Sequence, residues 1–499
     1  MKSALAALLT LVPAAFLLLA GSVASAQDLT DCRVGGIRNS VRCGVLRRAL
    51  DPARPQGPNF DLHYVVIPAM ARRNLPDPVF LLAGGPGQSA IGVAAQAMGL
   101  LGRLNNRRDI VLVDQRGTGQ SAPLQCDDPG HEDLADQADP QAQFKLLMAC
   151  KATLLKLPYI RSESDLGYFT TTLAMQDLEA VRAALGAEKI NLVGISYGTR
   201  AGIEYLRQFP SHVRRIVLDA VAPPEMVLPA SFSTDSQAAL DALLRACDQE
   251  KRCHATYPTL GADWASLLAS LPRADVSAAQ PLTGRVERFT LTREMVLGTV
   301  RSALYSPAAA AALPAAISAA AGGHVEPLLG LGSQLASRRG IQLAMGMHFS
   351  VVCAEDVPRL DVAADPPGAD FGVTDAALYR HVCEHWPRGA VPSAFYTVPP
   401  SPAPVLLFSG GLDPATPPRH GAQAAAALGA KAQHVVVPNA GHGVLGIGCA
   451  RDLVYRFIDA ADDATASAID ASCVKAIPRP GAFVPMSMAP SASSAGAAR

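Results

Sequence analysis

The residue with the clearest chemical potential is Ser196, the middle of the pentapeptide Gly-Ile-Ser-Tyr-Gly at 194–198. An apolar run, 190–193, precedes the pentapeptide, and an amphipathic run, 199–209, follows it. A strand, a Gly-x-Ser-x-Gly turn and a helix form a nucleophile elbow, in which the glycines permit a tight turn and the serine hydroxyl is exposed. The helix start adds backbone donors and the positive end of a dipole. Glycine and serine are common, so the pentapeptide alone is only a hypothesis.

A serine hydroxyl is a weak nucleophile at neutral pH. It needs an imidazole to accept its proton and a carboxylate to orient that imidazole. Asp413 follows the apolar run 405–408, and His442 follows the run 435–437. Both residues therefore fall at the carboxyl ends of predicted strands, as Ser196 does. The order serine, aspartate, histidine along the chain is the order found in α/β-hydrolases.

Both partners of Ser196 have alternative interpretations. Asp413 stands before a proline and could cap a turn. His442 is one of 11 histidines, most of which are expected to be structural or exposed. Asp219, after the apolar run 216–218, could also supply the acid. Asp413 is preferred because its strand directly precedes the strand of the histidine.

A glycine-rich loop after another predicted strand could stabilise the oxyanion of acyl transfer. Residues 82–87 read Leu-Ala-Gly-Gly-Pro-Gly, and two backbone amides are the usual donors for such an oxyanion. Gly85 would provide one amide and Tyr197, directly after the serine, the other. A phosphate-binding loop is disfavoured because no lysine follows at P-loop spacing and Gly-x-Gly-x-x-Gly is absent here. No cofactor and no metal is therefore expected at this site.

The elements that must position these residues follow an α/β pattern. Short apolar runs alternate with helical segments, which is typical of a mostly parallel sheet covered by helices on both faces. The alternation stops after residue 224 and resumes near 402, so a large helical cap is expected, inserted after the sixth strand. The runs predicted as strands are 64–67, 79–82, 110–113, 190–193, 216–218, 405–408 and 435–437.

These boundaries predict two core segments, 27–224 and 401–476, separated by a mainly helical cap, 225–400. Within the cap, the alanine-rich stretch 308–321 is expected to be a packed helix because Leu313 and Ile317 interrupt the alanines. The end of the chain, 477–499, is rich in alanine, serine and proline and is expected to be a disordered tail.

The amino terminus has the pattern of a cleavable signal peptide. Lys2 is followed by an apolar stretch, 4–20, and then by Ala-Ser-Ala at 24–26, so cleavage after Ala26 is expected. The apolar stretch is short for a retained anchor. The chain is therefore expected to be secreted or periplasmic, without stable membrane insertion after cleavage. Basic and acidic residues number 43 each, which argues against a nucleic-acid partner.

Ten cysteines in an exported chain predict disulfides. The simplest connectivity joins neighbours along the chain, although sequence cannot determine it. A competing interpretation is a metal site in the segment His-Val-Cys-Glu-His at 381–385. It is disfavoured because the segment lacks a second Cys/His pair at finger-like spacing and Cys383 has a disulfide role available. The ten cysteines are Cys32, Cys43, Cys126, Cys150, Cys247, Cys253, Cys353, Cys383, Cys449 and Cys473.

Six motifs resemble the prolyl and tripeptidyl aminopeptidase family of α/β-hydrolases, over most of the mature chain. The segment Cys-Glu-His-Trp-Pro at 383–387 is similar to the TAP-like carboxyl-terminal region of the exported tripeptidyl aminopeptidase branch. Where the family commonly begins its glycine loop with histidine, this chain has Ala83. The resemblance implies that Asp114 and Arg116 have a structural role, holding the loop beneath the active site. The six motifs occupy residues 83–87, 114–119, 194–198, 217–219, 412–417 and 441–443.

The resemblance implies a serine aminopeptidase that releases single residues or short peptides from free amino termini. A buried carboxylate in the cap would bind the substrate ammonium. Glu355 is the first candidate, followed by Asp356 and Glu225, although each could equally be a capping or solvated carboxylate. The alternatives are an esterase or amidase with the same triad, or a catalytically silent binding protein. The oligomeric state is not indicated.

Overall fold

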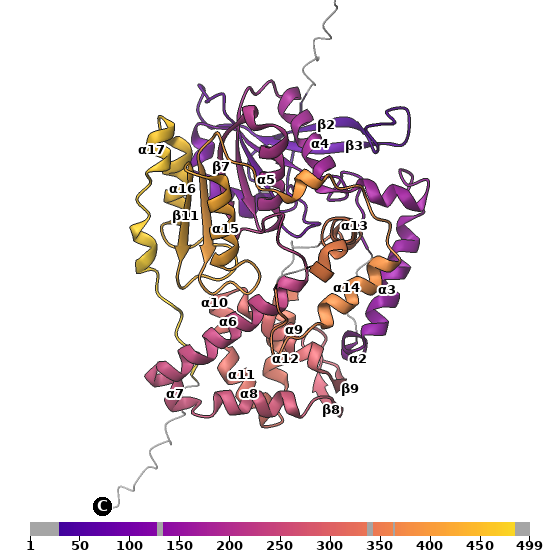
Figure 1. Cartoon of the computed structure of the whole chain (residues 1–499), viewed down its shortest axis with the longest axis vertical. Helices are drawn as coiled ribbons and strands as arrows, with labels where there is room; N and C mark the ends of the chain where they lie inside the picture. Colours follow the sequence, from indigo (N-terminus) through magenta and orange to yellow (C-terminus); the bar gives the residue numbers. More distant parts are fainter. Residues whose placement is uncertain (1–28, 127–132, 337–342, 363–364, 485–499) are drawn as a thin grey trace, which may run out of the picture.

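The computed structural model describes residues 29–126, 133–336, 343–362 and 365–484 (Figure 1). The predicted signal peptide, 1–26, lies outside the described residues. Within the described ranges, no helix combines the length and the apolar character needed to cross a membrane.

A nine-stranded sheet forms the centre of the core, in the order β1-β2-β3-β5-β4-β6-β7-β10-β11. From β5 to β11 neighbouring strands are parallel, whereas β1, β2 and β3 join the edge in antiparallel pairs. The strands span Thr30–Cys32 (β1), Val41–Ala49 (β2), Asn59–Ile67 (β3), Val79–Leu82 (β4), Ile110–Val113 (β5), Ile190–Ile195 (β6), Val213–Asp219 (β7), Val405–Gly410 (β10) and Ala432–Val437 (β11).

Every apolar run predicted as a strand lies in one of these strands. The parallel strands β4 and β5 are buried at every position, because helices cover both faces of the sheet. Strand β2 was not predicted. Only two of its nine positions are buried and it carries three arginines, so it lacks the continuous apolar run of a central strand.

Two layers of helices cover the sheet, as the sequence predicts. Helices α4 (Thr171–Ala184), α5 (Tyr197–Gln208) and α15 (Pro418–Leu428) pack on one face, where their apolar side chains join the larger core cluster. Helices α1 (Ala94–Leu101) and α16 (Ala450–Asp459) pack on the other face. Between β5 and α4, helices α2 (Leu134–Ala138) and α3 (Pro140–Leu154) extend toward the cap (Figure 1).

The cap follows β7, the seventh strand in chain order and not the sixth. Five of the predicted runs precede the cap, and β1 and β2 come before them. It has its own apolar core and includes a β-hairpin that the sequence did not predict. The alanine-rich stretch forms two short helices, with Leu313 and Ile317 buried. Cap elements are α6 (Ala230–Gln249), α7 (Lys251–Thr256), α8 (Leu260–Ala269), β8 (Arg273–Ala279), β9 (Val286–Leu291), α9 (Arg293–Leu304), α10 (Pro307–Ala310), α11 (Leu313–Ala321), α12 (Glu326–Ala336), α13 (Met345–Glu355) and α14 (Thr374–Glu384).

Residues 477–484, expected to belong to a disordered tail, lie along the molecule. The Phe483 amide donates to the carbonyl of Ala311 at 2.7 Å, and the Phe483 carbonyl accepts from the Tyr257 hydroxyl at 2.9 Å. These bonds hold the segment against the cap. Residues 485–499 lie outside the described residues.

The ten cysteines form five disulfides between neighbours along the chain, which is the simplest predicted connectivity. Cys383 on α14 is bonded to Cys353 on α13, so its sulfur is not available as a metal ligand. The remaining pairs are Cys32–Cys43, Cys126–Cys150, Cys247–Cys253 and Cys449–Cys473.

Candidate active site

Ser196 stands in a strained turn between β6 and α5. Its φ is 56° and its ψ is −123°. Residues other than glycine rarely adopt this backbone conformation, and those that do are often found at functional sites. A side chain at Gly194 would collide with the carbonyl oxygen of Gly198. One at Gly198 would collide with that of Leu82 on the neighbouring strand. Both glycines are therefore required for the turn that exposes Ser196.

Asp413 and His442 meet at the carboxyl ends of β10 and β11. His442 Nδ1 lies 2.9 Å from Asp413 Oδ2 and 3.1 Å from Oδ1. The carboxylate also accepts the amides of Ala415 and Thr416 and the Thr416 hydroxyl at 2.8–2.9 Å. It is 2% exposed, so these donors and the imidazole hold it in one orientation.

The negative charge of Asp413 favours the protonated form of His442. Burial lowers the pKa of His442, but the charge and hydrogen bond of Asp413 outweigh burial and leave this pKa above its usual value. Burial likewise raises the pKa of Asp413, and the contact with His442 and the backbone amides reverse this and lower it. Asp413 therefore stays ionised and stabilises a protonated His442.

Asp219, the alternative acid, has a different position. Its carboxylate accepts the amides of Val444 and Leu445 at 2.9–3.1 Å, just after His442, while its carbonyl accepts the amide of Ser196 at 2.9 Å. Asp219 is 1% exposed, and burial raises its pKa to about 6. It therefore joins the serine turn to the histidine loop through backbone atoms, without a hydrogen bond to the imidazole.

The glycine loop lies beside Ser196. A Cβ at Gly84 would be 3.3 Å from the Ser196 Cβ. Within the described part of the chain, the amides of Gly85 and Tyr197 donate to no other group, so both are free for an acceptor. Ala83, the departure from the family pattern, is 7% exposed and packs in the core.

Asp114 and Arg116 support the core beneath this loop. Asp114 accepts the Ser89 hydroxyl at 2.6 Å and the amides of Ile91 and Gln120. Arg116 is fully buried and makes two hydrogen bonds to Asp177, at 2.7 and 3.0 Å. Both residues have structural partners, as the resemblance implies.

Among the described residues, the His442 ring has polar contacts with Asp413 and, at 3.2 Å, with the Thr416 hydroxyl. No hydrogen bond joins this ring to the Ser196 hydroxyl in this structure. Catalytic hydrogen bonds are often long before substrate binds. Strands β6, β7, β10 and β11 are consecutive neighbours in the sheet, so the three predicted residues emerge at the same edge.

Cap residues that the sequence did not indicate cover this edge. The Tyr305 ring packs edge-on against His442 with centroids 4.8 Å apart, and its carbonyl accepts the His442 amide at 2.9 Å. His348 on α13 contacts the Pro86 carbonyl at 3.3 Å and the Tyr379 hydroxyl at 2.8 Å. Burial lowers the pKa of His348 to about 4, so it is neutral at pH 7. A carbonyl only accepts, so Nδ1 of His348 carries the proton.

Two of the three carboxylates expected to bind a substrate amine are closed off. Glu355 is 1% exposed and accepts the amide and hydroxyl of Thr171 at 2.7 and 2.9 Å. Asp356 is fully buried and bonded to both terminal nitrogens of Arg200 at 2.9–3.1 Å. Core groups therefore engage both carboxylates in this structure, which argues against direct contact with a substrate amine.

Glu355 instead contacts the serine turn indirectly, through Thr171. The Thr171 hydroxyl that donates to Glu355 lies 2.7 Å from the Tyr197 hydroxyl, and Arg200 is one turn farther along α5. Burial raises the pKa of Glu355 to about 7. The end of α13 is thus fastened to the start of α5, where the nucleophile and one candidate oxyanion amide lie.

Glu225 is half-buried and differs from the other two carboxylates. One oxygen accepts the Val398 amide at 3.3 Å, while the other is buried without a hydrogen-bond partner among the described residues. It is the one carboxylate of the three with an oxygen that has no hydrogen-bond partner among the described residues.

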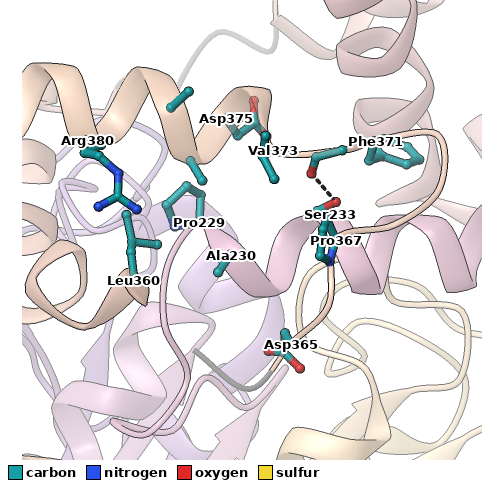
Figure 2. A pocket seen from close by; sticks show the side chains of 13 residues that line it. Pro229, Ala230, Ser233, Leu360, Asp365, Pro367, Phe371, Val373, Asp375 and Arg380 are labelled. Atoms are coloured by element: carbon teal, nitrogen blue, oxygen red, sulfur yellow. Dashed lines mark hydrogen bonds between the residues drawn. The ribbon is translucent and has the colours of Figure 1, made fainter. Parts of the chain in front are cut away.

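A separate cavity lies inside the cap. It has a volume of about 360 Å³ between the start of α6, the segment before α14 and α14 itself (Figure 2). Ser233 donates to the Gly372 carbonyl at 2.7 Å across one side. None of Ser196, Asp413 and His442 lines this cavity, so we assign it no chemistry. Its lining includes Pro229, Ala230, Leu360, Asp365, Phe371, Val373, Asp375 and Arg380.

Known families match both core segments. Residues 77–252 match the family described as alpha/beta hydrolase fold, and residues 370–473 match the family described as TAP-like protein. The second match begins ahead of the boundary expected at 401.

Three relatives span different shares of the chain. The tripeptidyl aminopeptidase of Streptomyces lividans is 33% identical over 210 residues, which are 40% of this chain and 38% of that protein. The serine protease Hip1 of Mycobacterium bovis is 26% identical over 430 residues, 79% of this chain and 81% of that protein. A protein of Mycobacterium tuberculosis named carboxylesterase B is 28% identical over 455 residues, 82% of this chain and 83% of that protein.

The match to the Streptomyces aminopeptidase thus spans well under half of that relative. The two family matches agree with the observed sheet, its two helical layers and the elbow at Ser196. This chain belongs to the α/β-hydrolase family, in the branch with a TAP-like carboxyl-terminal region.

Proposed function

We propose that this protein is an exported serine aminopeptidase that releases single residues or short peptides from free amino termini. The observation that carries the proposal is the buried Asp413–His442 pair at the same sheet edge as the strained Ser196 turn. The relatives named as a tripeptidyl aminopeptidase and a serine protease support peptides as substrates.

In the proposed mechanism, His442 Nε2 accepts the Ser196 proton as the hydroxyl oxygen attacks the scissile carbonyl. Asp413 keeps the other proton on Nδ1 and stabilises the imidazolium. The imidazolium then protonates the departing amine, which leaves an acyl-enzyme. A water molecule, deprotonated by His442, attacks the ester, and the acyl group leaves as Ser196 regains its proton.

The amides of Gly85 and Tyr197 would donate to the oxyanion of both tetrahedral intermediates. Their lack of intramolecular acceptors and the position of Gly84 beside Ser196 support this role. Removal of one oxyanion donor typically costs about 10²- to 10³-fold in kcat.

The substrate ammonium requires an acceptor, and Glu225 is the remaining candidate of the three predicted carboxylates. Its unpartnered oxygen supports this assignment. Five disulfides support an oxidising compartment and therefore export, together with the predicted signal peptide.

An esterase or amidase is the second candidate function. The relative named carboxylesterase B, which matches over 82% of this chain, supports it. The same triad would serve both chemistries, so substrates must separate them.

A panel of chromogenic substrates tests the proposal. Tripeptidyl, alanyl and prolyl anilides are compared with free and acetylated amino ends, beside short-chain nitrophenyl esters. We expect cleavage of a free-amine anilide and a large loss on acetylation. Ester cleavage with no activity on any free-amine anilide would favour the esterase. Glu225→Gln should raise KM for the free-amine anilide more than for an ester, with Glu294→Gln, on α9, as a control.

A further inference from the structure

We propose that His381, Glu384 and His385 form a zinc-binding site on the surface of the cap, at the carboxyl-terminal end of α14. Each residue offers one ligand atom, and these atoms all lie within 4.8 Å of one another. Histidines four residues apart, with a glutamate three residues after the first, face the same side of a helix. Two imidazoles and a carboxylate are a donor set that Zn²⁺ uses in proteins, with water in the fourth position.

The separation of one pair of ligand atoms matches the edge of a tetrahedral zinc site. His381 Nδ1 lies 3.4 Å from Glu384 Oε2, which is long for a hydrogen bond between these groups. With zinc–ligand bonds of about 2.1 Å, one edge of the tetrahedron measures about 3.4 Å. These two atoms therefore already stand at the separation that a shared zinc ion would require.

Neighbouring groups restrict the ligands before any ion binds. The Phe144 ring, from α3, stacks on His381 with centroids 4.0 Å apart and lies 5.7 Å from the ring of His385. The disulfide of Cys383 anchors the helix between the ligands. Side chains that are already restricted lose less conformational entropy on binding, which favours affinity.

The charge and exposure of the site also permit a cation. The side chains of His381 and Glu384 are 45% and 56% exposed, so a hydrated ion can reach them. Lys151 is near because its ammonium donates to the His385 carbonyl, but its charge is paired with Glu163 at 2.5 Å. The local repulsion of a second cation is therefore reduced.

The site would stabilise α14, which is linked through His348 to the glycine loop of the candidate active site. Helix α14 carries Tyr379, which bonds His348, and Asp375, which pairs with Arg301 at 2.7 Å. A bound ion would oppose unwinding of the last turn of α14 and raise the thermal stability of the folded chain. This role is independent of the proposed peptidase activity.

Calorimetric titration of the full secreted chain with ZnCl₂, after treatment with EDTA and dialysis, tests the site. We expect one Zn²⁺ per chain. His381→Ala should weaken binding more than about tenfold, since loss of an outer-shell partner alone can cost that much. His254→Ala is the matched control, because His254 is exposed and lies 3.1 Å from Asp248 without belonging to a three-ligand group among the described residues.

Thermal unfolding provides a second readout. Zinc should raise the Tm of the wild type and of His254→Ala, and leave that of His381→Ala unchanged. Absence of zinc binding to the wild type would overturn the proposal. Equal binding by the wild type and His381→Ala would also overturn it, because the ion would then bind elsewhere.

Discussion

Substitution of Asp413 and of Asp219 by asparagine distinguishes the catalytic carboxylate from the carboxylate that holds the histidine loop through backbone amides. In Asp413→Asn, an amide nitrogen would face His442 Nδ1 or the donors of Ala415 and Thr416. The imidazole would then favour the tautomer with its proton on Nε2, which cannot accept the serine proton. The corresponding change in a Ser-His-Asp protease lowers kcat by about 10⁴, or about 5 kcal/mol.

Asp219→Asn should behave differently, because Asp219 bonds only backbone amides near the histidine. With its oxygen at the Oδ2 position, asparagine can keep both the Val444 and the Leu445 amides, but its NH₂ group then faces the Val444 amide and leaves a buried donor unsatisfied. We expect a loss of about 1–3 kcal/mol in the free energy of unfolding. Displacement of the His442 loop should lower kcat by no more than about 100-fold.

The assay is kcat and KM for the best chromogenic substrate, with urea unfolding of each variant. Asp413→Asn should remain folded and lose about 10⁴ in kcat with KM little changed. A 10⁴-fold loss in Asp219→Asn, with most of the activity retained in Asp413→Asn, would identify Asp219 as the catalytic acid instead.

The acid limb of the pH profile of kcat/KM should have its midpoint above the usual histidine pKa of 6.5. Asp413 raises the pKa of His442, and only neutral His442 accepts a proton. A midpoint well below 6.5 would contradict this. Burial raises the folded-state pKa of Glu355 from 4.5 to about 7, so this residue favours the folded state below pH 4.5 and loses that contribution as pH rises toward 7. Urea titrations of Glu355→Gln should accordingly show stability that falls less over this range than in the wild type, and an identical pH dependence would count against a buried carboxyl there. Gly198→Ala should abolish soluble, active protein because its Cβ meets the Leu82 carbonyl, whereas Gly261→Ala, on an open part of α8, should leave both unchanged; normal activity of Gly198→Ala would exclude the elbow geometry.

The sequence predicted the parallel strands and the positions of Ser196, Asp413 and His442 at their carboxyl ends, because buried strands and tight turns leave local patterns. It missed β1 and β2 at the antiparallel end of the sheet, since three arginines interrupt the apolar residues of β2. It also missed Tyr305, whose contact with His442 joins residues far apart in the chain.

Glu355 shows a second limit of prediction from sequence. A carboxylate after a buried cysteine can equally face a substrate cleft or a buried arginine. Here Thr171 and the neighbouring Arg200, both on core helices, determine the outcome. No local pattern reports which core helix will pack against the end of α13.

The central claim is that Ser196 is the nucleophile, and active-site labelling tests it most directly. The protein is treated with a fluorophosphonate and digested, and the modified peptide is identified by mass spectrometry. We expect one adduct per chain on Ser196, with concurrent loss of activity, and no adduct in Ser196→Ala. Labelling of another residue with the same loss of activity, or full activity in Ser196→Ala, would contradict it.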